Sequence, residues 1–167
     1  AAACLSLRID SNTVKNGLYD FKGAHRRYEF RGKYNGATII DDYAHHPSEI
    51  NATLKTARSS TKGKVIAVFQ PHTYTRTKKL LNKFAEALTH SDETIILDIY
   101  PAREKDTGEV HSKDIIAKMK SFNKNGRYAN SFQEAADIVR SIACEGDTII
   151  TIGAGNVNEV AEMLIDK

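Results

Sequence analysis

Short apolar runs alternate with longer segments of mixed polarity along most of the chain. The runs at 64–69 and 148–152 are almost continuously apolar, which is typical of central parallel strands buried on both faces. The longer segments carry apolar residues three or four positions apart, a spacing that predicts helices. We expect strands at 64–69, 93–98, 126–129 and 148–152, and helices at 47–60, 77–89, 112–122, 132–144 and 156–165.

This alternation of strands and helices through short connections predicts an α/β fold. It favours a Rossmann-like architecture, in which helices cover both faces of a mostly parallel sheet. Ahead of this region, the dipeptide Asn35-Gly36 separates two β-rich runs, 28–34 and 37–43. Asn-Gly is the strongest short hairpin signal, because both central positions of the turn need a positive φ. We therefore expect an N-terminal hairpin to precede the alternating region.

The first twenty residues follow a different pattern. Residues 1–8 have the composition of a helix already under way, with no capping residue before it. Ser11 is expected to cap a second short helix that ends near Gly17. We interpret residues 1–20 as the end of an upstream domain and place the boundary in the connector 21–27. Residues 21–167 then form the second domain.

The composition limits the classes of partner. With 41% hydrophobic and 27% charged residues, the 167-residue chain resembles an ordinary globular domain. Its net charge of +3 is spread evenly, without the dense basic and aromatic block that nucleic-acid binding favours. No apolar run approaches membrane-spanning length, and we expect no membrane partner. Cys4 and Cys144 match no metal or redox spacing, which favours a reducing, cytoplasmic location.

Polar or glycine-rich segments follow predicted strands at four places, 41–47, 70–77, 98–104 and 153–156. In open α/β sheets, ligands bind beyond the carboxyl ends of the strands. Because the carboxyl ends of parallel strands meet at one edge, we expect all four segments to gather along a single rim. The residues at the opposite ends of the strands are ordinary turn residues, so the chemistry is predicted at one edge only.

The first of these segments holds two adjacent histidines and two adjacent carboxylates. His46 falls at the N-cap of the predicted helix, where Ser, Thr, Asp or Asn is usual. A local rule broken at a ligand-binding edge favours a functional role for His45 or His46 over a plain turn role. A zinc site is disfavoured, because adjacent histidines project in different directions and no second ligand pair stands at helical spacing. Asp41 and Asp42 either share a magnesium ion held chiefly by phosphates or cap a turn.

The second segment offers an anion binder. The planar guanidinium of Arg76 can hold a carboxylate or phosphate through two hydrogen bonds. His72 has no evident structural duty after Pro71, and it could donate to an anion or transfer a proton near neutral pH. The structural role expected of Thr75 and Thr77 is to cap the following helix.

Three weaker signals accompany these two segments. The turn 153–156 joins a strand to a helix and could point its amides at an anion, but it is neither a complete G-x-G-x-x-G nor a P-loop. The charged loop 98–104 is of a kind common on any surface. Arg26 and Arg27 could hold a phosphate at the domain boundary, although paired arginines on a connector are usually solvated.

Taken together, these segments resemble the C-terminal domain of the UDP-N-acetylmuramate–L-alanine ligases, members of the Mur ligase family. The resemblance covers essentially the whole chain, with 21–28 similar to the junction that leads into the domain and 153–155 to its last strand-to-helix turn. The first two of the motifs that carry it are highly specific together. The motifs are DDYAHHP at 41–47, FQPHTYTRT at 69–77 and DIYPARE at 98–104.

The resemblance implies a three-domain cytoplasmic bacterial enzyme that adds the first amino acid of the peptidoglycan stem peptide. It implies that ATP and Mg²⁺ convert the carboxylate of UDP-N-acetylmuramate into an acyl phosphate, which the amine of L-alanine attacks. Carried over by position, two residues would contact the nucleotide, namely Arg27 and Asp42. Four residues would face the alanine and the acyl phosphate, namely Tyr43, His45, His72 and Arg76. Of these, His45, His72 and Arg76 would be catalytic.

Two departures qualify what the resemblance implies. Many family members carry arginine where Thr73 stands, so one anion contact is missing or supplied elsewhere. No P-loop occurs in the sequence, because the family's phosphate-binding loop belongs to the central domain, which would hold most of the ATP and Mg²⁺. We therefore expect these 167 residues alone to be inactive. The alternatives are the related ligase that recycles a whole peptide and an independent nucleotide- or anion-binding module.

Overall fold

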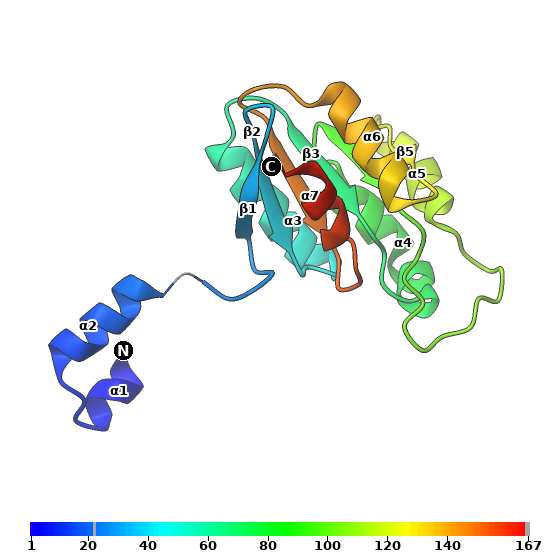
Figure 1. The fold of residues 1–167 in the computed structure, drawn as a ribbon. Coiled ribbons are helices and arrows are strands. Elements are labelled where there is room, and N and C mark those ends of the chain that lie inside the picture. Colours follow the sequence, from blue (N-terminus) through cyan, green and yellow to red (C-terminus); the bar gives the residue numbers. More distant parts are fainter. Residues whose placement is uncertain (22, 166–167) are drawn as a thin grey trace.

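A computed structural model describes residues 1–21 and 23–165 of the chain (Figure 1). Six strands form one sheet in the order β1-β2-β6-β3-β4-β5. Every neighbouring pair is parallel except β1 and β2, which are antiparallel. The predicted mostly parallel sheet is therefore confirmed. The strands are β1 (Glu29–Tyr34), β2 (Ala37–Asp42), β3 (Val65–Phe69), β4 (Glu93–Ile96), β5 (Arg127–Tyr128) and β6 (Thr148–Ile152).

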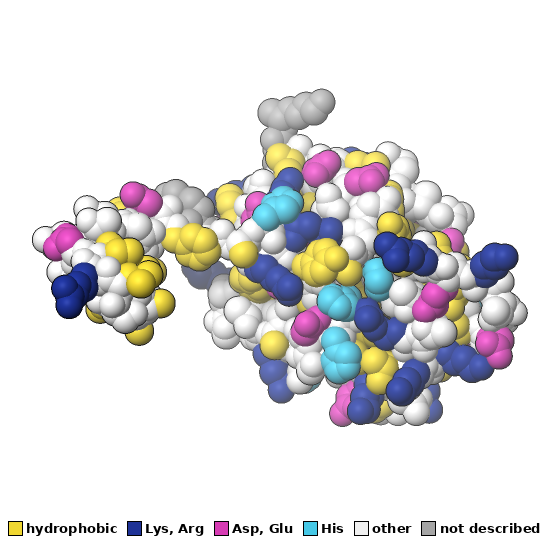
Figure 2. Space-filling view, turned by 90° about the horizontal axis from the view of Figure 1, so that it is seen from below, with side chains coloured by type: hydrophobic (Ala, Val, Ile, Leu, Met, Phe, Trp, Pro, Cys, Tyr) yellow, Lys and Arg dark blue, Asp and Glu magenta, His cyan; other side chains and the backbone are white. Residues whose placement is uncertain are grey.

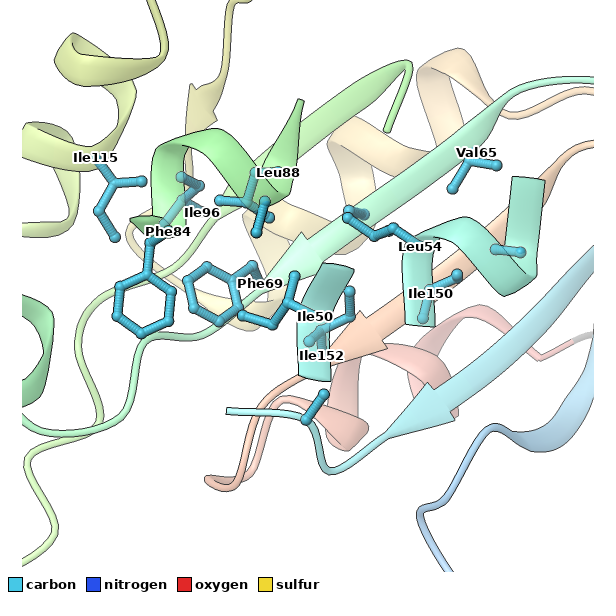
Figure 3. Packing of buried hydrophobic residues seen from close by; sticks show 14 of the residues in the cluster. Ile50, Leu54, Val65, Phe69, Phe84, Leu88, Ile96, Ile115, Ile150 and Ile152 are labelled. Atoms are coloured by element: carbon cyan, nitrogen blue, oxygen red, sulfur yellow. The ribbon is translucent and has the colours of Figure 1, made fainter. Parts of the chain in front are cut away.

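Helices cover both faces of this sheet, as the sequence predicts. The helices α3 (Pro47–Ser60), α4 (Tyr74–Leu88) and α5 (Ser112–Met119) pack on one face, and α6 (Phe132–Ile142) and α7 (Asn158–Leu164) pack on the other. The β3 strand shows why its sequence is continuously apolar: its side chains alternate between the two layers and all five are buried. Figure 3 shows the first layer, where the rings of Phe69 and Phe84 lie 5.5 Å apart between their centres.

Most predicted helices and strands are found, and the differences lie at their ends. The predicted helix 112–122 is α5 followed by a short 3₁₀ helix, Lys120–Phe122. The predicted strand 126–129 is shorter in the structure, where β5 at the edge of the sheet pairs with β4 through two residues. The hairpin turn has the expected positive φ, 46° at Asn35 and 77° at Gly36.

The expectation for the start of the second helix is wrong. The helix α2 (Ser11–Asp20) begins at Ser11, but its cap is Asp10, whose carboxylate accepts a hydrogen bond of 3.0 Å from the N–H of Thr13. It also continues through Gly17 instead of ending there, because a glycine inside a helix costs only about 1 kcal/mol.

Figure 1 shows the short helix α1 (Ala2–Ser6) and α2 apart from the sheet, at the end of an extended connector. Neither of these two helices contains a buried residue, and Leu7 and Tyr19 are 76% and 87% exposed. They therefore contribute nothing to the core of the sheet domain. Part of the predicted connector, Lys22, lies outside the described residues. In the described part of the chain, no helix has the length and apolarity needed to cross a membrane.

Candidate functional site

The four polar segments meet at one edge of the sheet, as predicted. The parallel strands β2, β6, β3 and β4 all end there, and Figure 2 shows histidines gathered on this face among Lys and Arg side chains. The His45 ring lies 6.0 Å from the His72 ring between centres, and His72 stacks on Tyr100 at 5.6 Å. Tyr43 meets His45 edge-on at 5.5 Å. The rim thus brings together side chains from three separate loops.

A buried ion pair fixes one side of this rim. The Arg26 Nε atom donates to the fully buried carboxylate of Asp41 at 2.7 Å, and Thr151 donates to the other Asp41 oxygen at 2.6 Å. The two remaining guanidinium nitrogens donate to the carbonyls of Gly155 and Gly153, at 2.7 and 2.8 Å. Arg26 therefore ties the connector to the last strand and its turn, and the solvated role expected of it is wrong.

Asp42 points to the opposite face of the sheet, as successive strand residues do. Its carboxylate accepts hydrogen bonds from the N–H groups of Ala44 and Tyr28, at 2.8 and 3.0 Å, and from the hydroxyl of Thr53 at 3.2 Å. Of the two interpretations left open, capping a turn is the one that these contacts support. The predicted contact of Asp42 with a nucleotide stays a prediction.

The carboxylates at this edge do not form a metal site. Asp41 and Asp42 face opposite sides of β2, and Arg26 already neutralises Asp41, so the two cannot share one magnesium ion. Among residues 1–21 and 23–165, no cluster of three histidine, cysteine or acidic side chains has a metal-binding arrangement.

The turn 153–156 is packed rather than open. The N–H of Gly153 donates to the carbonyl of Asp42 at 3.1 Å, and a Cβ at Gly155 would clash first with Gln70 Oε1 and then lie 2.8 Å from the Tyr100 ring. Glycine is needed at 155 because the Gln70 side chain and the Tyr100 ring occupy the space of a side chain. The N–H of Gly153 is therefore already bound, and the idea that the other amides of this turn face an anion stays a prediction.

The two adjacent histidines have different structural duties. The Nδ1 atom of His46 accepts from the N–H of Ser48 at 3.4 Å and lies 2.8 Å from its hydroxyl, while Glu49 accepts from the His46 N–H at 3.1 Å. His46 thus caps the N-terminus of α3. His111 caps α5 in the same manner, so a histidine at the N-cap is not by itself evidence of function, and a functional role for His45 or His46 stays a prediction.

His45 is oriented by the backbone instead. Its Nδ1 atom lies 3.0 Å from the carbonyl oxygen of Tyr43, which can only accept, so Nδ1 carries a proton, and in the neutral ring Nε2 is then the acceptor. Burial alone would raise the pKa of the nearby Glu49, but hydrogen bonds from the N–H groups of His45 and His46 lower it. An ionised Glu49 therefore holds both histidines in place.

His72 has the opposite tautomer. Its Nδ1 atom lies 3.4 Å from Arg76 NH1, and a guanidinium can only donate, so Nδ1 accepts and the proton resides on Nε2. Burial lowers the pKa of His72, and the positive charge of Arg76, joined by that of His45 when its ring is protonated, lowers it further. His72 is therefore a neutral hydrogen-bond donor near pH 7.

The loop before α4 is strained. Thr73 has φ 66° and ψ 143°, a conformation that residues other than glycine rarely adopt. Thr75 does not cap α4 as expected, since its N–H and hydroxyl donate to the Glu104 carboxylate, and Thr77 donates back to the Thr73 carbonyl at 2.7 Å. The helix starts at Tyr74, three residues before the predicted position.

The remaining predicted nucleotide contact, Arg27, is exposed at the junction. Its guanidinium carbon lies 5.5 Å from the centre of the Tyr43 ring, and that of Arg26 lies 5.2 Å away. Cations over an aromatic face are attracted to the ring. Arg27 is thus placed near Tyr43, and no side chain or carbonyl of residues 1–21 and 23–165 accepts a hydrogen bond from its guanidinium.

Sequence reasoning missed the structural importance of Arg26 and Tyr100. Arg26 precedes a strand and resembles any basic connector residue, and only the fold shows its partners more than 100 positions away. Tyr100 lies in a charged, proline-containing loop of a kind common on any surface, so local sequence does not mark it as important. The glycine at 155 was a usable signal, since a glycine in a packed turn indicates a close neighbour.

The fold is that of a Rossmann-like domain, and imidazole and guanidinium side chains gather at the carboxyl ends of its parallel strands. The chain matches the family model described as "Mur ligase, glutamate ligase domain" over residues 26–155, and it belongs to the Mur ligase family.

Named relatives agree with this membership. The chain is 48% identical over 164 residues to the UDP-N-acetylmuramate–L-alanine ligase of Acetivibrio thermocellus, covering 98% of this chain and 35% of that protein. The crystal structure of the UDP-N-acetylmuramate–alanine ligase of Thermotoga maritima is 26% identical with a TM-score of 0.78, covering 98% of this chain and 34% of that one. A murein peptide ligase from Psychrobacter arcticus, 24% identical with a TM-score of 0.70, covers the same shares and shows the common fold. The chain thus spans about a third of the length of the curated relatives that it matches.

Proposed function

We propose that the chain acts as the C-terminal domain of an ATP-dependent UDP-N-acetylmuramate–L-alanine ligase in peptidoglycan precursor synthesis. The observation that carries this proposal is the near-complete coverage of the chain by ligases of that name, at an identity far above what a shared fold requires. The rim supports it, because donors and a guanidinium converge where the two specific motifs meet. The recycling ligase remains the second candidate, and the similarity of fold to the Psychrobacter protein is what favours it.

In this proposal the reaction has two steps, activation of a carboxylate and formation of an amide bond. The muramyl carboxylate attacks the terminal phosphate of ATP and releases ADP, and the alanine nitrogen then attacks the acyl carbon as phosphate leaves. Upstream domains supply the phosphate-binding loop and hold ATP and Mg²⁺, while Arg27 and Asp42 are assigned to the nucleotide. The proposal places residues 1–20 in the preceding domain, 21–167 in this one and the whole enzyme in the cytoplasm.

The two histidines suit different tasks at the rim. The His45 Nε2 atom is an acceptor, and we assign it to the proton that the attacking amine loses. The His72 Nε2–H is a donor, and we assign it with Arg76 to the negative charge that develops on the acyl phosphate. Tyr43, beside His45, is assigned to the alanine side of the site.

Phosphate release by the full-length protein tests this proposal. We expect release to require ATP, UDP-N-acetylmuramate and L-alanine together, and a peptide in place of L-alanine to be a poor substrate. Release that is independent of alanine, or that is faster with the peptide, would contradict the proposal.

The same assay tests the assignment of Arg76. We expect Arg76→Ala to lower kcat by about 10²–10³-fold, the loss typical when a donor to a developing negative charge is removed. Arg127→Ala is the matched control, since it removes the same charge from an exposed position on the edge strand β5. Near wild-type turnover in Arg76→Ala would show that the anion assignment is wrong.

A further inference from the structure

A hollow of about 650 Å³ opens at the start of α4 and is lined by Arg76, the residue that contacts His72. Its walls come from the end of the first specific motif, the strained loop before α4 and the first two turns of that helix. The residues that line it are His46, Thr73, Thr75, Arg76, Lys79, Leu80 and Glu104. The hollow therefore adjoins the predicted catalytic residues and includes a cation, Lys79, that has no assigned role.

Two permanent positive charges face this hollow. Arg76 and Lys79 are three positions apart on α4, a spacing that places side chains on the same face of a helix. Within the described residues Lys79 has no ion pair, whereas the adjacent Lys78 donates to Glu109 at 2.9 Å and is neutralised there. Lys78 is thus held by Glu109, whereas Lys79 lines the hollow.

One acid, Glu104, also lines the hollow. Hydrogen bonds from the hydroxyl and the N–H of Thr75 lower the pKa of Glu104 and hold its carboxylate at the start of α4. One negative charge therefore stands against the two positive charges of Arg76 and Lys79, and the hollow keeps a net positive charge. A net positive hollow next to a donor such as His72 attracts an oxyanion.

We propose that Lys79 and Arg76 together bind a carboxylate or phosphate group of a substrate in this hollow. The inference rests on the proposed function, because it assigns a binding residue to the same reaction. Both L-alanine and UDP-N-acetylmuramate carry such a group, as does ATP, and the structure names the shared chemistry of the ligand rather than its source.

Steady-state kinetics of the full-length enzyme test the proposal. In Lys79→Gln we expect the KM of one substrate to rise about five- to tenfold with kcat within twofold, the size of a partly screened contact between unit charges. Lys78→Gln is the matched control and should leave all three KM values unchanged. Lys79→Arg should restore the KM, and Lys79→Glu should raise it beyond the value for Lys79→Gln.

The substrate whose KM moves identifies the anion. Calorimetric titration of L-alanine, UDP-N-acetylmuramate and ATP against the same proteins provides a readout that does not depend on turnover. Unchanged KM values and affinities in Lys79→Gln would overturn the inference, as would equal changes in Lys78→Gln. If the wild-type enzyme showed no alanine-dependent phosphate release, the proposed function would be contradicted. A difference between Lys79→Gln and Lys78→Gln in the titrations would then still support the anion site.

Discussion

The two halves of the rim contain the same kinds of residue but use them differently. In the half built on β2 and β6, the charges of Arg26 and Asp41 are buried together and the carbonyls of the last turn are bound. In the half built on β3 and β4, the guanidinium of Arg76 meets only the ring of His72 among the described residues, and it faces a hollow. The comparison separates the Arg26–Asp41 clamp, which builds the rim, from Arg76, which is available to a ligand; His45 follows β2 but lies beside His72 on the ligand side.

The largest expected effect is on the buried half. Asp41→Asn removes the charge that compensates Arg26, and breaking a buried pair typically costs about 3–5 kcal/mol. We expect the free energy of unfolding of the 167-residue chain to fall by about 3 kcal/mol in urea titrations at pH 7. Arg76→Ala should change the same quantity by less than about 0.5 kcal/mol, as surface substitutions usually do.

The opposite ranking would contradict the division of the rim. If Arg76→Ala were as destabilising as Asp41→Asn, Arg76 would be part of the scaffold and its effect on turnover would say little about anion binding. If Asp41→Asn were harmless, the Arg26 clamp would contribute little to the fold.

The same division explains what the sequence could predict. Periodicity located β3 and β6 almost to the residue, because continuous burial on both faces leaves an unmistakable apolar run. The meeting of His45, His72 and Arg76 at one edge also followed from topology alone. These features depend on short-range pattern and on the parallel order of the strands.

The sequence could not predict which polar residues would be bound by other parts of the fold and which would stay available to a ligand. Arg26 and Arg27 are adjacent and chemically equal, yet one is clamped on residues of the last turn and the other is exposed. Likewise, a capping histidine and a ligand-facing histidine, His46 and His45, stand side by side. Such assignments depend on partners distant in the sequence and on side-chain direction, which local pattern does not encode.

A second prediction concerns the strained loop in the ligand-facing half. Thr73 holds a positive φ that costs a residue with a Cβ on the order of 1–3 kcal/mol. We expect Thr73→Gly to be more stable than Thr73→Ala by about 1 kcal/mol, because glycine relieves that strain. At positions with ordinary backbone angles, glycine is the less stable of the two.

This pair of variants isolates the backbone, since both remove the threonine side chain. Urea titration of the two chains under one set of conditions measures the difference. An alanine variant that was equal to or more stable than the glycine variant would show that the loop carries no strain, and the ligand-facing half would lose one of its distinguishing features.

The smallest expected effect is the response of His72 to pH. Burial first, and then the charge of Arg76 and that of His45 when protonated, lower its pKa from the ordinary 6.5, so the folded chain binds this proton less readily than the unfolded chain. The stability contributed by neutral His72 is therefore complete above pH 6.5 and is lost as the pH falls from there through the lower folded value. We expect the NMR titration midpoint of the His72 ring to lie below 6.5 and to rise in Arg76→Ala, while His111, on the exposed cap of α5, serves as the internal comparison. A His72 midpoint at or above 6.5, or one that Arg76→Ala leaves in place, would mean that the guanidinium does not act on the ring. His72 and Arg76 would then not act as the pair to which the charge of the acyl phosphate is assigned.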